Sequence, residues 1–435
     1  MKTLTYKNSD FYKITDYSIA YPGLTRGNQD YSNNVFYYDG KYYVVMYNFQ
    51  GIELYGSATV WFFIDIWETD LTEVTPGNYF SLNSQTKFTV ESYDGPTGSN
   101  NMYYFSNDIY LHSHLDADGV LHCIISDLDY GDWVIYKQLT LVNGVFVVSG
   151  GDDITSDVPN CIQNKFTVFK SGNTKYLALI SEASSGAKSV LIYTVGSSLT
   201  LQQTISLGDT GTGTYAVAID YDHNGDGTTL VSTDIWCAWA TYSAFPSIKI
   251  YYTKLTKSGS SWSVGSIVDI DTGVDFYNWG MTDFFSCWTG EQFLITTMLV
   301  DGSYTYTFGH LIKVNSDLTY VNHVFPTQGN TDDGNPYLFR IQLTHKGSTI
   351  YPIQHIGYDS GGNYNEGQWA IPCTLSDDTI TWGEELDLDE PFTGSYYGVT
   401  NAPDAPDVDL DCFPRHVVGG KFFAAGVHYV FPGAV

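Results

Sequence analysis

Short apolar runs joined by tight glycine turns recur along the whole chain. Each unit has a strand-like run, a turn that holds glycine, and a second strand-like run, as in NVFYYDGKYYVVMYN at 34–48. Asp-Gly or Gly-Gly between two apolar runs is the strongest short-range signal of a β-hairpin. The pattern predicts seven hairpins, at 34–48, 108–126, 165–181, 215–234, 283–299, 337–356 and 412–431.

The spacing of these hairpins leaves room for further strands. The turn glycines lie at positions 40, 119, 172, 227, 290, 347 and 420. Additional apolar runs stand between them at 59–67, 132–141, 189–195 and 248–255. Four strands per repeat, seven times over, is the plan of a β-propeller. The sequence therefore predicts an all-β fold, a single β-propeller of about seven four-stranded blades.

The two ends of the chain predict how such a ring closes. The last hairpin stops soon after its second strand, and residues 2–14 read as strand material ahead of the first hairpin. Pairing the N-terminal strand with the last blade would leave fewer exposed strand edges. We therefore expect residues 1–435 to form one domain, with 1–15 as the closing strand of the last blade.

Composition agrees with a fold made of strands. Aromatic residues make up 16% of the chain, and 42 glycines supply turns. Charged residues make up only 15%, against about 25% in a typical soluble domain. Aromatic and β-branched residues favour strands, whereas the residues that fill helix surfaces are scarce here.

The charge of the chain narrows the choice of partners. There are 48 acidic residues against 19 basic ones, which gives a formal net charge of −29. Binding to nucleic acid needs clustered Lys and Arg, and the sequence has no such cluster, so nucleic acid is excluded as a partner. An anionic membrane surface is disfavoured for the same reason. An acidic surface favours solubility and the binding of metal cations.

Targeting signals are also informative. No run approaches 18 apolar residues, so membrane insertion is not expected. The N-terminal residues MKTLTYKNSDFYKI lack the apolar core of a secretory signal, so we expect synthesis in the cytoplasm. A virion component, extracellular only after lysis, has the same features.

The six cysteines form no CxxC pair and are expected to be buried thiols in the core.

Degenerate motifs on three predicted outer turns resemble a known family. SDDTITW at 376–382 and KSGSSW at 257–262 each keep part of the pattern Ser-x-Asp-x-Gly-x-Thr-Trp, and DYGDW at 129–133 is one residue short of it. This pattern is the Asp box of BNR-type, sialidase-like propellers. The chain therefore resembles that family in its blade plan. The Asp box is structural in that family, so the resemblance implies a fold and carries no catalytic residue across.

The sharpest candidate site lies in the fourth hairpin. Asp220, Asp222, Asn224 and Asp226 place oxygen-bearing side chains at alternate positions, followed by Gly227 where the chain must turn. Oxygen ligands at this spacing are what a Ca²⁺ loop needs. The later ligand positions of an EF-hand loop are not matched, since position 12 is a valine. The alternative is a solvated hairpin turn, which these residue types also favour.

Three histidines form a second candidate. His112 and His114 lie two residues apart on one predicted strand, and His122 follows on the partner strand. A three-residue turn would place His122 opposite His114, where imidazoles can bind a transition metal. Polar surface histidines are the alternative interpretation.

The chain has only three arginines, Arg26, Arg340 and Arg415, and sialidases hold a substrate carboxylate with three. They are candidate binding residues for an acidic glycan, and pairing with the abundant carboxylates is the alternative. Tyr396 and Tyr397 lie in the longest predicted loop, EPFTGSYYGVTNAPDAPD, and are candidate contact residues. Similar loops are expected at 92–101 and 271–280.

Two functions remain open at this point. The first is a non-catalytic binding or structural module, in a virion-associated tail, fibre or decoration protein or another surface-recognition protein. Its partner would be a protein assembly or a surface glycan, and the oligomeric state, including an oligomer within a larger assembly, stays open. The second is a glycan-active hydrolase or lyase of sialidase-like plan. The sequence holds no motif that fixes an acid, a base and a nucleophile together, which favours the first.

Overall fold

A computed structural model describes this chain as a succession of β-sheets. The residues described are 3–7, 11–16, 34–38, 41–54, 57–69, 73–75, 79–80, 83–96, 109–116, 118–127, 133–209, 214–223, 230–244, 247–270, 276–289, 292–301, 306–324, 329–330, 336–346, 348–359, 364–384, 386–387 and 422–427. The chain divides into two compact units, Met1–Asn160 with Pro406–Val435 and Cys161–Ala405. The hypothesis of a single domain stays a prediction.

Strands account for nearly all of the regular structure among these residues, as the composition predicts. One 3₁₀ turn, Thr155–Asp157, is the exception within the described part of the chain. No helix in that part is long and apolar enough to cross a membrane. The all-β prediction is therefore confirmed.

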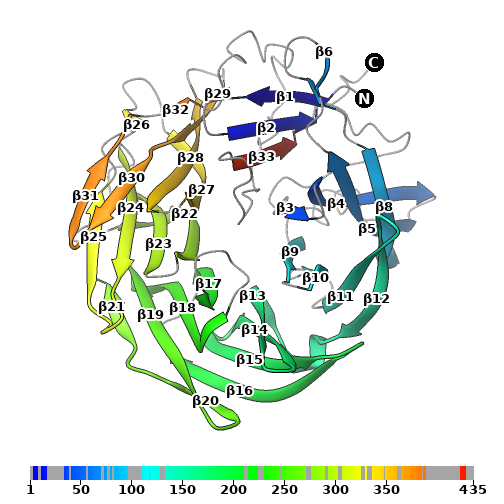
Figure 1. Cartoon of the computed structure of the whole chain (residues 1–435), viewed down its shortest axis with the longest axis horizontal. Coiled ribbons are helices and arrows are strands. Elements are labelled where there is room, and N and C mark those ends of the chain that lie inside the picture. The colour runs from blue at the N-terminus through cyan, green and yellow to red at the C-terminus, as the bar shows by residue number, and fades with distance from the viewer. Residues whose placement is uncertain are drawn as a thin grey trace. The chain divides into compact units, whose positions relative to one another are not determined.

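The first unit holds two four-stranded antiparallel sheets (Figure 1). The first sheet runs in the order β3 (Asn34–Tyr38), β4 (Lys41–Leu54), β5 (Ser57–Thr69) and β8 (Asn83–Pro96). The second contains β9 (Ile109–Leu115), β10 (Val120–Asp127), β11 (Trp133–Val142) and β12 (Val145–Asp153), again in chain order. A short pair joins β6 (Glu73–Thr75) to β7 (Tyr79–Phe80). Each four-stranded sheet is an up-and-down meander, the topology of a propeller blade.

The third sheet of this unit joins the two ends of the chain. Strands β1 (Thr3–Lys7) and β2 (Phe11–Asp16) form a hairpin, and β2 pairs with β33 (Phe422–Val427). The second pairing is parallel, with Phe11 opposite Phe422 and Asp16 opposite Val427. The N-terminal segment thus shares a sheet with a strand of the seventh predicted hairpin. The rest of that hairpin lies outside the described residues.

The second unit continues the plan with four sheets of four to six strands, each built mainly from consecutive strands. The first contains β13 (Cys161–Ser171), β14 (Thr174–Ala183), β15 (Ala187–Val195) and β16 (Leu199–Asp209). The second contains β17 (Thr214–His223), β18 (Leu230–Ala244), β19 (Ser247–Ser258), β20 (Ser261–Val264) and β21 (Val268–Ile270). The third contains β22 (Phe276–Trp288), β23 (Phe293–Asp301), β24 (Tyr306–Val314), β25 (Tyr320–Val324) and β26 (Gly329–Asn330). The fourth contains β27 (Pro336–Lys346), β28 (Thr349–Asp359), β29 (Tyr364–Ala370), β30 (Cys373–Ser376), β31 (Thr379–Trp382) and β32 (Leu386–Asp387).

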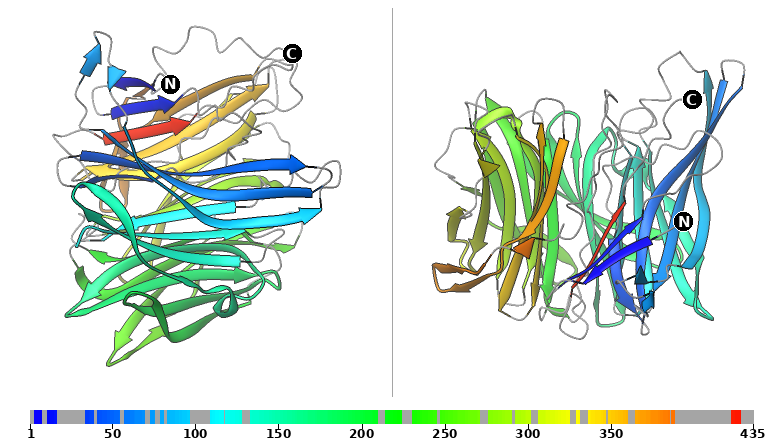
Figure 2. Two further views of the ribbon diagram at one scale, coloured as in Figure 1. Left: turned by 90° about the vertical axis from the view of Figure 1, so that its right-hand side faces the viewer. Right: turned by 90° about the horizontal axis from the view of Figure 1, so that it is seen from above.

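The first strands of these four sheets lie side by side in chain order: β13 contacts β17, β17 contacts β22, and β22 contacts β27. In Figure 1 the later strands of each sheet extend outward from these four. Figure 2 shows that each sheet twists along the length of its strands. The second unit is therefore a series of radial sheets that pack face to face.

Face-to-face packing explains why strand β18 is apolar at successive positions. Side chains alternate between the two faces of a strand. Cys237 and Trp239 are buried in one cluster against the β13–β16 sheet, whereas Trp236, Ala238 and Ala240 are buried in another against the β22–β25 sheet. Both faces of the sheet are covered, so the strand reads as a continuous apolar run.

Six of the seven predicted hairpins are confirmed as antiparallel strand pairs: β3–β4, β9–β10, β13–β14, β17–β18, β22–β23 and β27–β28. The additional strands predicted at 59–67, 132–141, 189–195 and 248–255 are confirmed as β5, β11, β15 and β19, with small shifts at their ends. Cys123, Cys161, Cys237 and Cys373 are buried free thiols.

Two predicted loops are partly wrong. Strand β8 extends to Pro96, and β22 begins at Phe276, so both enter the segments predicted as the loops 92–101 and 271–280. The physical reason is strand pairing: Pro96 lies opposite Ser57, and Phe276 lies opposite Asp301. Aromatic residues in these segments, which the sequence argument assigned to recognition loops, also favour strands.

Candidate functional site

A hydrogen-bonded chain of buried polar side chains closes the turn between β9 and β10. Asp116 begins the turn, His122 lies on β10, and Tyr136 lies on β11. His122 is paired with Gln138, so Tyr136 is its diagonal neighbour on the same face of the sheet. The register of three strands therefore brings together three side chains that are far apart in the sequence.

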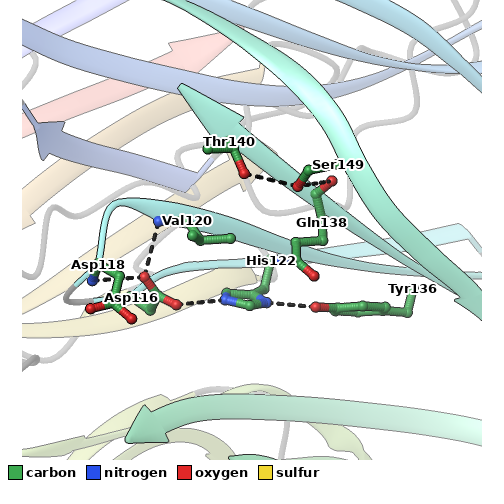
Figure 3. A network of polar contacts seen from close by, with 8 residues as sticks. All are labelled: Asp116, Asp118, Val120, His122, Tyr136, Gln138, Thr140 and Ser149. Carbon is green, nitrogen blue, oxygen red and sulfur yellow. Dashed lines mark hydrogen bonds and ion pairs between the residues drawn. The ribbon is translucent and has the colours of Figure 1, made fainter. Parts of the chain in front are cut away.

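The hydrogen bonds of this network are short (Figure 3). His122 Nδ1 lies 2.7 Å from the Tyr136 hydroxyl oxygen, and His122 Nε2 lies 2.9 Å from Asp116 Oδ2. The other carboxylate oxygen of Asp116 accepts hydrogen bonds from the backbone N–H groups of Asp118 and Val120, both at 2.9 Å. One carboxylate thus holds the turn and the imidazole together.

Burial decides what this network can do chemically. His122 and Tyr136 have no exposed surface, and Asp116 is 7% exposed. Burial, and then the nearby Cys123 and Asp116, raise the pKa of Tyr136 far above its usual range, so the phenol stays protonated. It can then donate to His122 Nδ1 while Nε2–H donates to Asp116. A substrate has no access to these atoms, and the arrangement stabilises the hairpin.

The register predicted for the three histidines is confirmed, because His122 lies directly opposite His114. The metal hypothesis for His112, His114 and His122 is wrong. Both ring nitrogens of His122 are bonded to Asp116 and Tyr136. Among the described residues, no group of three or more His, Cys, Asp or Glu side chains is placed to hold a metal ion.

The predicted calcium loop begins on β17, where Asp220 is buried. Asp220 Oδ1 accepts the backbone N–H of Tyr221, and Oδ2 accepts the backbone N–H of Trp288, each at 2.9 Å. The Trp288 indole N–H in turn donates to the His223 carbonyl at 2.7 Å. Asp220 therefore joins two neighbouring sheets, β17–β20 and β22–β25.

The next acidic residue of that loop, Asp222, has only one of its two carboxylate oxygens hydrogen-bonded to a described residue. Asp222 Oδ2 accepts a hydrogen bond from the Ser232 hydroxyl at 2.6 Å, across the hairpin on β18. Asp222 Oδ1 is buried and has no hydrogen-bond partner among the described residues. Asn224 and Asp226 lie outside the described residues. The calcium site stays a prediction.

Of the candidate binding residues, only Arg340 falls in the described part of the chain. It lies on β27, the first strand of its sheet, opposite His355 and next to a register shift in the ladder. Arg26, Arg415, Tyr396 and Tyr397 lie outside the described residues. The glycan-binding set therefore stays a prediction.

Both described Asp-box-like turns contact the preceding sheet. Trp262 on β20 is buried and exchanges two hydrogen bonds with Gln203 on β16, through its backbone N–H at 2.9 Å and its carbonyl at 2.7 Å. Lys257 lies over the rings of Tyr176 and Trp262, 4.3 and 4.4 Å from their centroids. In the later turn, Lys313 on β24 donates to the carbonyl of Asp377. Both turns therefore help to hold neighbouring sheets together, and the Asp-box resemblance stays a prediction.

The structure contains a buried ion pair that the sequence did not predict. Glu182 and Lys188 lie opposite each other on β14 and β15, with no exposed side-chain surface and 3.5 Å between Nζ and Oε1. Lys188 also donates to the Gly186 carbonyl at 2.7 Å. Charged residues at both ends of a short polar turn look like surface positions, and only the packing of the sheet buries them. The network of Asp116 and Tyr136 was missed for a related reason, because it depends on strand register.

Comparison with known proteins gives distant likenesses only. No protein-family model matches the chain, and no curated protein matches it. Similar solved structures include a six-bladed β-propeller fungal lectin from Aleuria aurantia, with a TM-score of 0.35, 12% identity, and 77% of this chain and 93% of the lectin covered. A Trypanosoma rangeli sialidase has a TM-score of 0.40 and 9% identity, with 84% and 57% covered. The α-L-arabinofuranosidase Arb93A from Fusarium graminearum has a TM-score of 0.37 and 9% identity, with 79% and 97% covered. At these levels they assign neither an activity nor a ligand to this chain.

Proposed function

We propose that this chain is a β-propeller of about seven blades, closed by the N-terminal strand, that serves as a rigid recognition module. Three successive sheets that each follow the chain order over four strands, and the adjacent first strands of all four sheets, support the propeller plan in the second unit. The parallel pairing of β2 with β33 supports closure by the two ends of the chain. The β17–β20 sheet has apolar side chains buried on both faces, as blades stacked around an axis require.

The function we propose is non-catalytic binding of a surface glycan or a protein partner, in a virion-associated or other surface assembly. One observation carries the proposal: buried polar side chains in two sheets are bonded to the frame. Asp116, His122 and Tyr136 bond one another, and Asp220 bonds the backbone of a neighbouring sheet. Groups used in this way stiffen a scaffold, and a rigid scaffold that presents loops is suited to recognition.

The recognition loop is tested by deletion. Removing residues 392–400, which include Tyr396 and Tyr397, should abolish binding to a panel of surface polysaccharides and leave the melting temperature nearly unchanged. Leu201→Ser on the outer strand β16 is the matched control and should bind like wild type. Unchanged binding by the deletion variant would contradict this assignment.

The same panel tests the alternative, a glycan-active hydrolase or lyase. We expect wild-type protein to cleave no polysaccharide on this panel, and Arg340→Ala and Arg415→Ala to behave in the same way. If wild-type protein cleaves a polysaccharide and either variant abolishes the cleavage, the chain is an enzyme and the binding proposal fails.

We also propose a Ca²⁺ site at the turn that follows β17. The support is Asp222 Oδ1, a buried carboxylate oxygen without a hydrogen-bond partner among the described residues. A cation would compensate such an oxygen, and Asn224 and Asp226 follow at the spacing that hard cations use. Asp220 fits less well, since both of its oxygens accept backbone N–H groups. We therefore propose Asp222, Asn224 and Asp226 as ligands and Asp220 as a structural support.

A further inference from the structure

Exposed valines are concentrated on one hairpin of the first unit. Val142, Val145, Val147 and Val148, on β11 and β12, keep between 41 and 49% of their surface exposed. They are four of the nine large exposed aliphatic side chains in the described part of the chain. Elsewhere the outer strands β16 and β20 each carry one such residue, Leu201 and Val264. Single exposed apolar residues need no explanation, but a cluster of this kind marks an interaction surface.

The backbone of this hairpin explains why the valines face outward. Asn143 and Gly144 at the tip both have positive φ angles, 53° and 79°, as a two-residue type I′ turn requires. Val147 and Val148 pair with consecutive residues, Thr140 and Leu139, so they lie on opposite faces of β12, and both are exposed. The β-bulge follows them, with Ser149 as its extra residue. Ser149 secures the bulge, because its hydroxyl accepts from Thr140 at 2.9 Å and donates to the Gln138 carbonyl at 3.3 Å (Figure 3).

Strand β12 is also the edge of its sheet. The strand order is β12-β11-β10-β9, and β11 is the one strand paired with β12 in the described part of the chain. Contacts between β12 and β8 leave the four valines exposed. An edge strand is usually protected by charged side chains or proline, and the segment 138–151, QLTLVNGVFVVSGG, contains neither.

The charge of the molecule indicates what such an edge can bind. Two copies of a chain with a net charge of −29 repel each other wherever acidic surfaces meet. The segment 138–151 carries no charge, and the acidic residues of β12, Asp152 and Asp153, stand at its end. Two copies can therefore approach along residues 145–151 without that penalty. An antiparallel pair of identical strands is self-complementary about a two-fold axis, which is the commonest symmetry of protein dimers.

We propose that the exposed edge of β12 pairs with β12 of a second copy of this chain. The valines of the two copies would pack against each other beside the new ladder. One strand pair with its side chains is a small interface, and stable dimers bury about 1,200–2,000 Å². The dimer is therefore reversible, with a dissociation constant in the micromolar range, and it forms only as the protein is concentrated.

Sedimentation velocity over a range of protein concentrations tests this association. Wild-type protein should shift from monomer to dimer as concentration rises. Val148→Lys, which adds a charge to the edge, should stay monomeric over the same range. Val231→Lys is the matched control, since Val231 is 64% exposed on β18, outside the patch, and it should dimerise like wild type. Melting temperatures of the three proteins establish that each is folded.

Two results would overturn the proposal: a wild type that stays monomeric at high micromolar concentration, or a dimer that persists in Val148→Lys. Equal loss of dimer in Val231→Lys would also contradict it, because the effect of the added lysine would then not be specific to the edge of β12. Raising the salt concentration should strengthen the wild-type dimer, since salt screens repulsion between acidic chains. Weaker dimerisation at high salt would contradict the charge argument.

Hydrogen exchange gives a readout that needs no variant. Backbone amides of residues 145–151 should exchange more slowly at high than at low protein concentration, because strand pairing protects them. Amides of the outer strand β16 should exchange at the same rate at both concentrations. Slower amide exchange on β16 and not on β12 would place the contact elsewhere and contradict the proposal. These measurements use no glycan, so their failure is distinguishable from failure of the proposed binding function.

Discussion

Two turns at equivalent positions in the repeat are held by different means. In the first unit, the turn from β9 to β10 is closed by its own sheet, through Asp116, His122 and Tyr136. In the second unit, the end of β17 is tied to the neighbouring sheet, through Asp220 and Trp288. The first turn depends on strand register within one blade-like sheet, and the second depends on how two sheets pack. Damage to the second turn should therefore cost more, because it loosens two sheets at once.

Trp288→Ala should have the largest effect on stability. Trp288 is 7% exposed, stacks on Trp236 with 5.4 Å between ring centroids, and donates its indole N–H to His223. Removing a buried tryptophan costs about 3–5 kcal/mol of unfolding free energy, measured by urea denaturation. Trp288→Phe keeps an aromatic ring and loses the hydrogen bond, so it should cost less than half as much. Equal losses for the two variants would show that the hydrogen bond, and not the stacking, carries the contact.

Asp116→Ala should have the next largest effect. The substitution leaves His122 and the backbone N–H groups of Asp118 and Val120 without their acceptor. Loss of hydrogen bonds to a buried charged group costs about 2–3 kcal/mol. The same urea denaturation measures it, with Asp157→Ala on the 3₁₀ turn as a control acid that should cost under about 0.5 kcal/mol. A cost for Asp116→Ala above that of Trp288→Ala would reverse the ranking of the two turns.

Asp220 and Asp222, the two aspartates at the end of β17, should differ in how their substitution changes the stabilisation by Ca²⁺. A ligand that binds only the folded chain raises the unfolding free energy by about 2.7 kcal/mol when its concentration is a hundred times its dissociation constant. Asp222→Asn should remove that gain and change little in the presence of a chelator. Asp220→Asn should destabilise the chain with or without Ca²⁺, because its carboxylate accepts the Trp288 N–H. Thermal melts with Ca²⁺ and with chelator measure both variants, and a wild type that melts identically in the two conditions has no calcium site here.

The sequence predicted the repeats well and the polar contacts poorly, for a physical reason. Hairpins such as 165–181 are local: alternating apolar residues and a glycine turn specify both strands within a few residues. The contact of His122 with Tyr136 depends on the register of a third strand, and the buried pair of Glu182 and Lys188 depends on what covers the sheet. Only the opposition of His122 and His114 could be deduced, because the turn between them is short enough to count.

The smallest effect should come from Tyr136→Phe, and its pH dependence identifies the cause. Loss of one buried neutral hydrogen bond costs about 1 kcal/mol near pH 7. Burial raises the pKa of Tyr136 in the folded chain, whereas an unfolded tyrosine ionises near pH 10. The folded state then holds a proton that the unfolded state loses, so stability is fully present below about pH 10 and falls as pH rises beyond it. Tyr136→Phe removes that proton, so its unfolding free energy should fall less steeply than wild type between about pH 10 and 11. Tyr252→Phe on β19 is the matched variant in the second unit, because burial also raises the pKa of Tyr252, whose hydroxyl donates to the Leu318 carbonyl. Alkaline unfolding curves that run parallel for wild type and Tyr136→Phe would show that this phenol is not held protonated, and that the network around His122 is more open than its closed hydrogen bonds indicate.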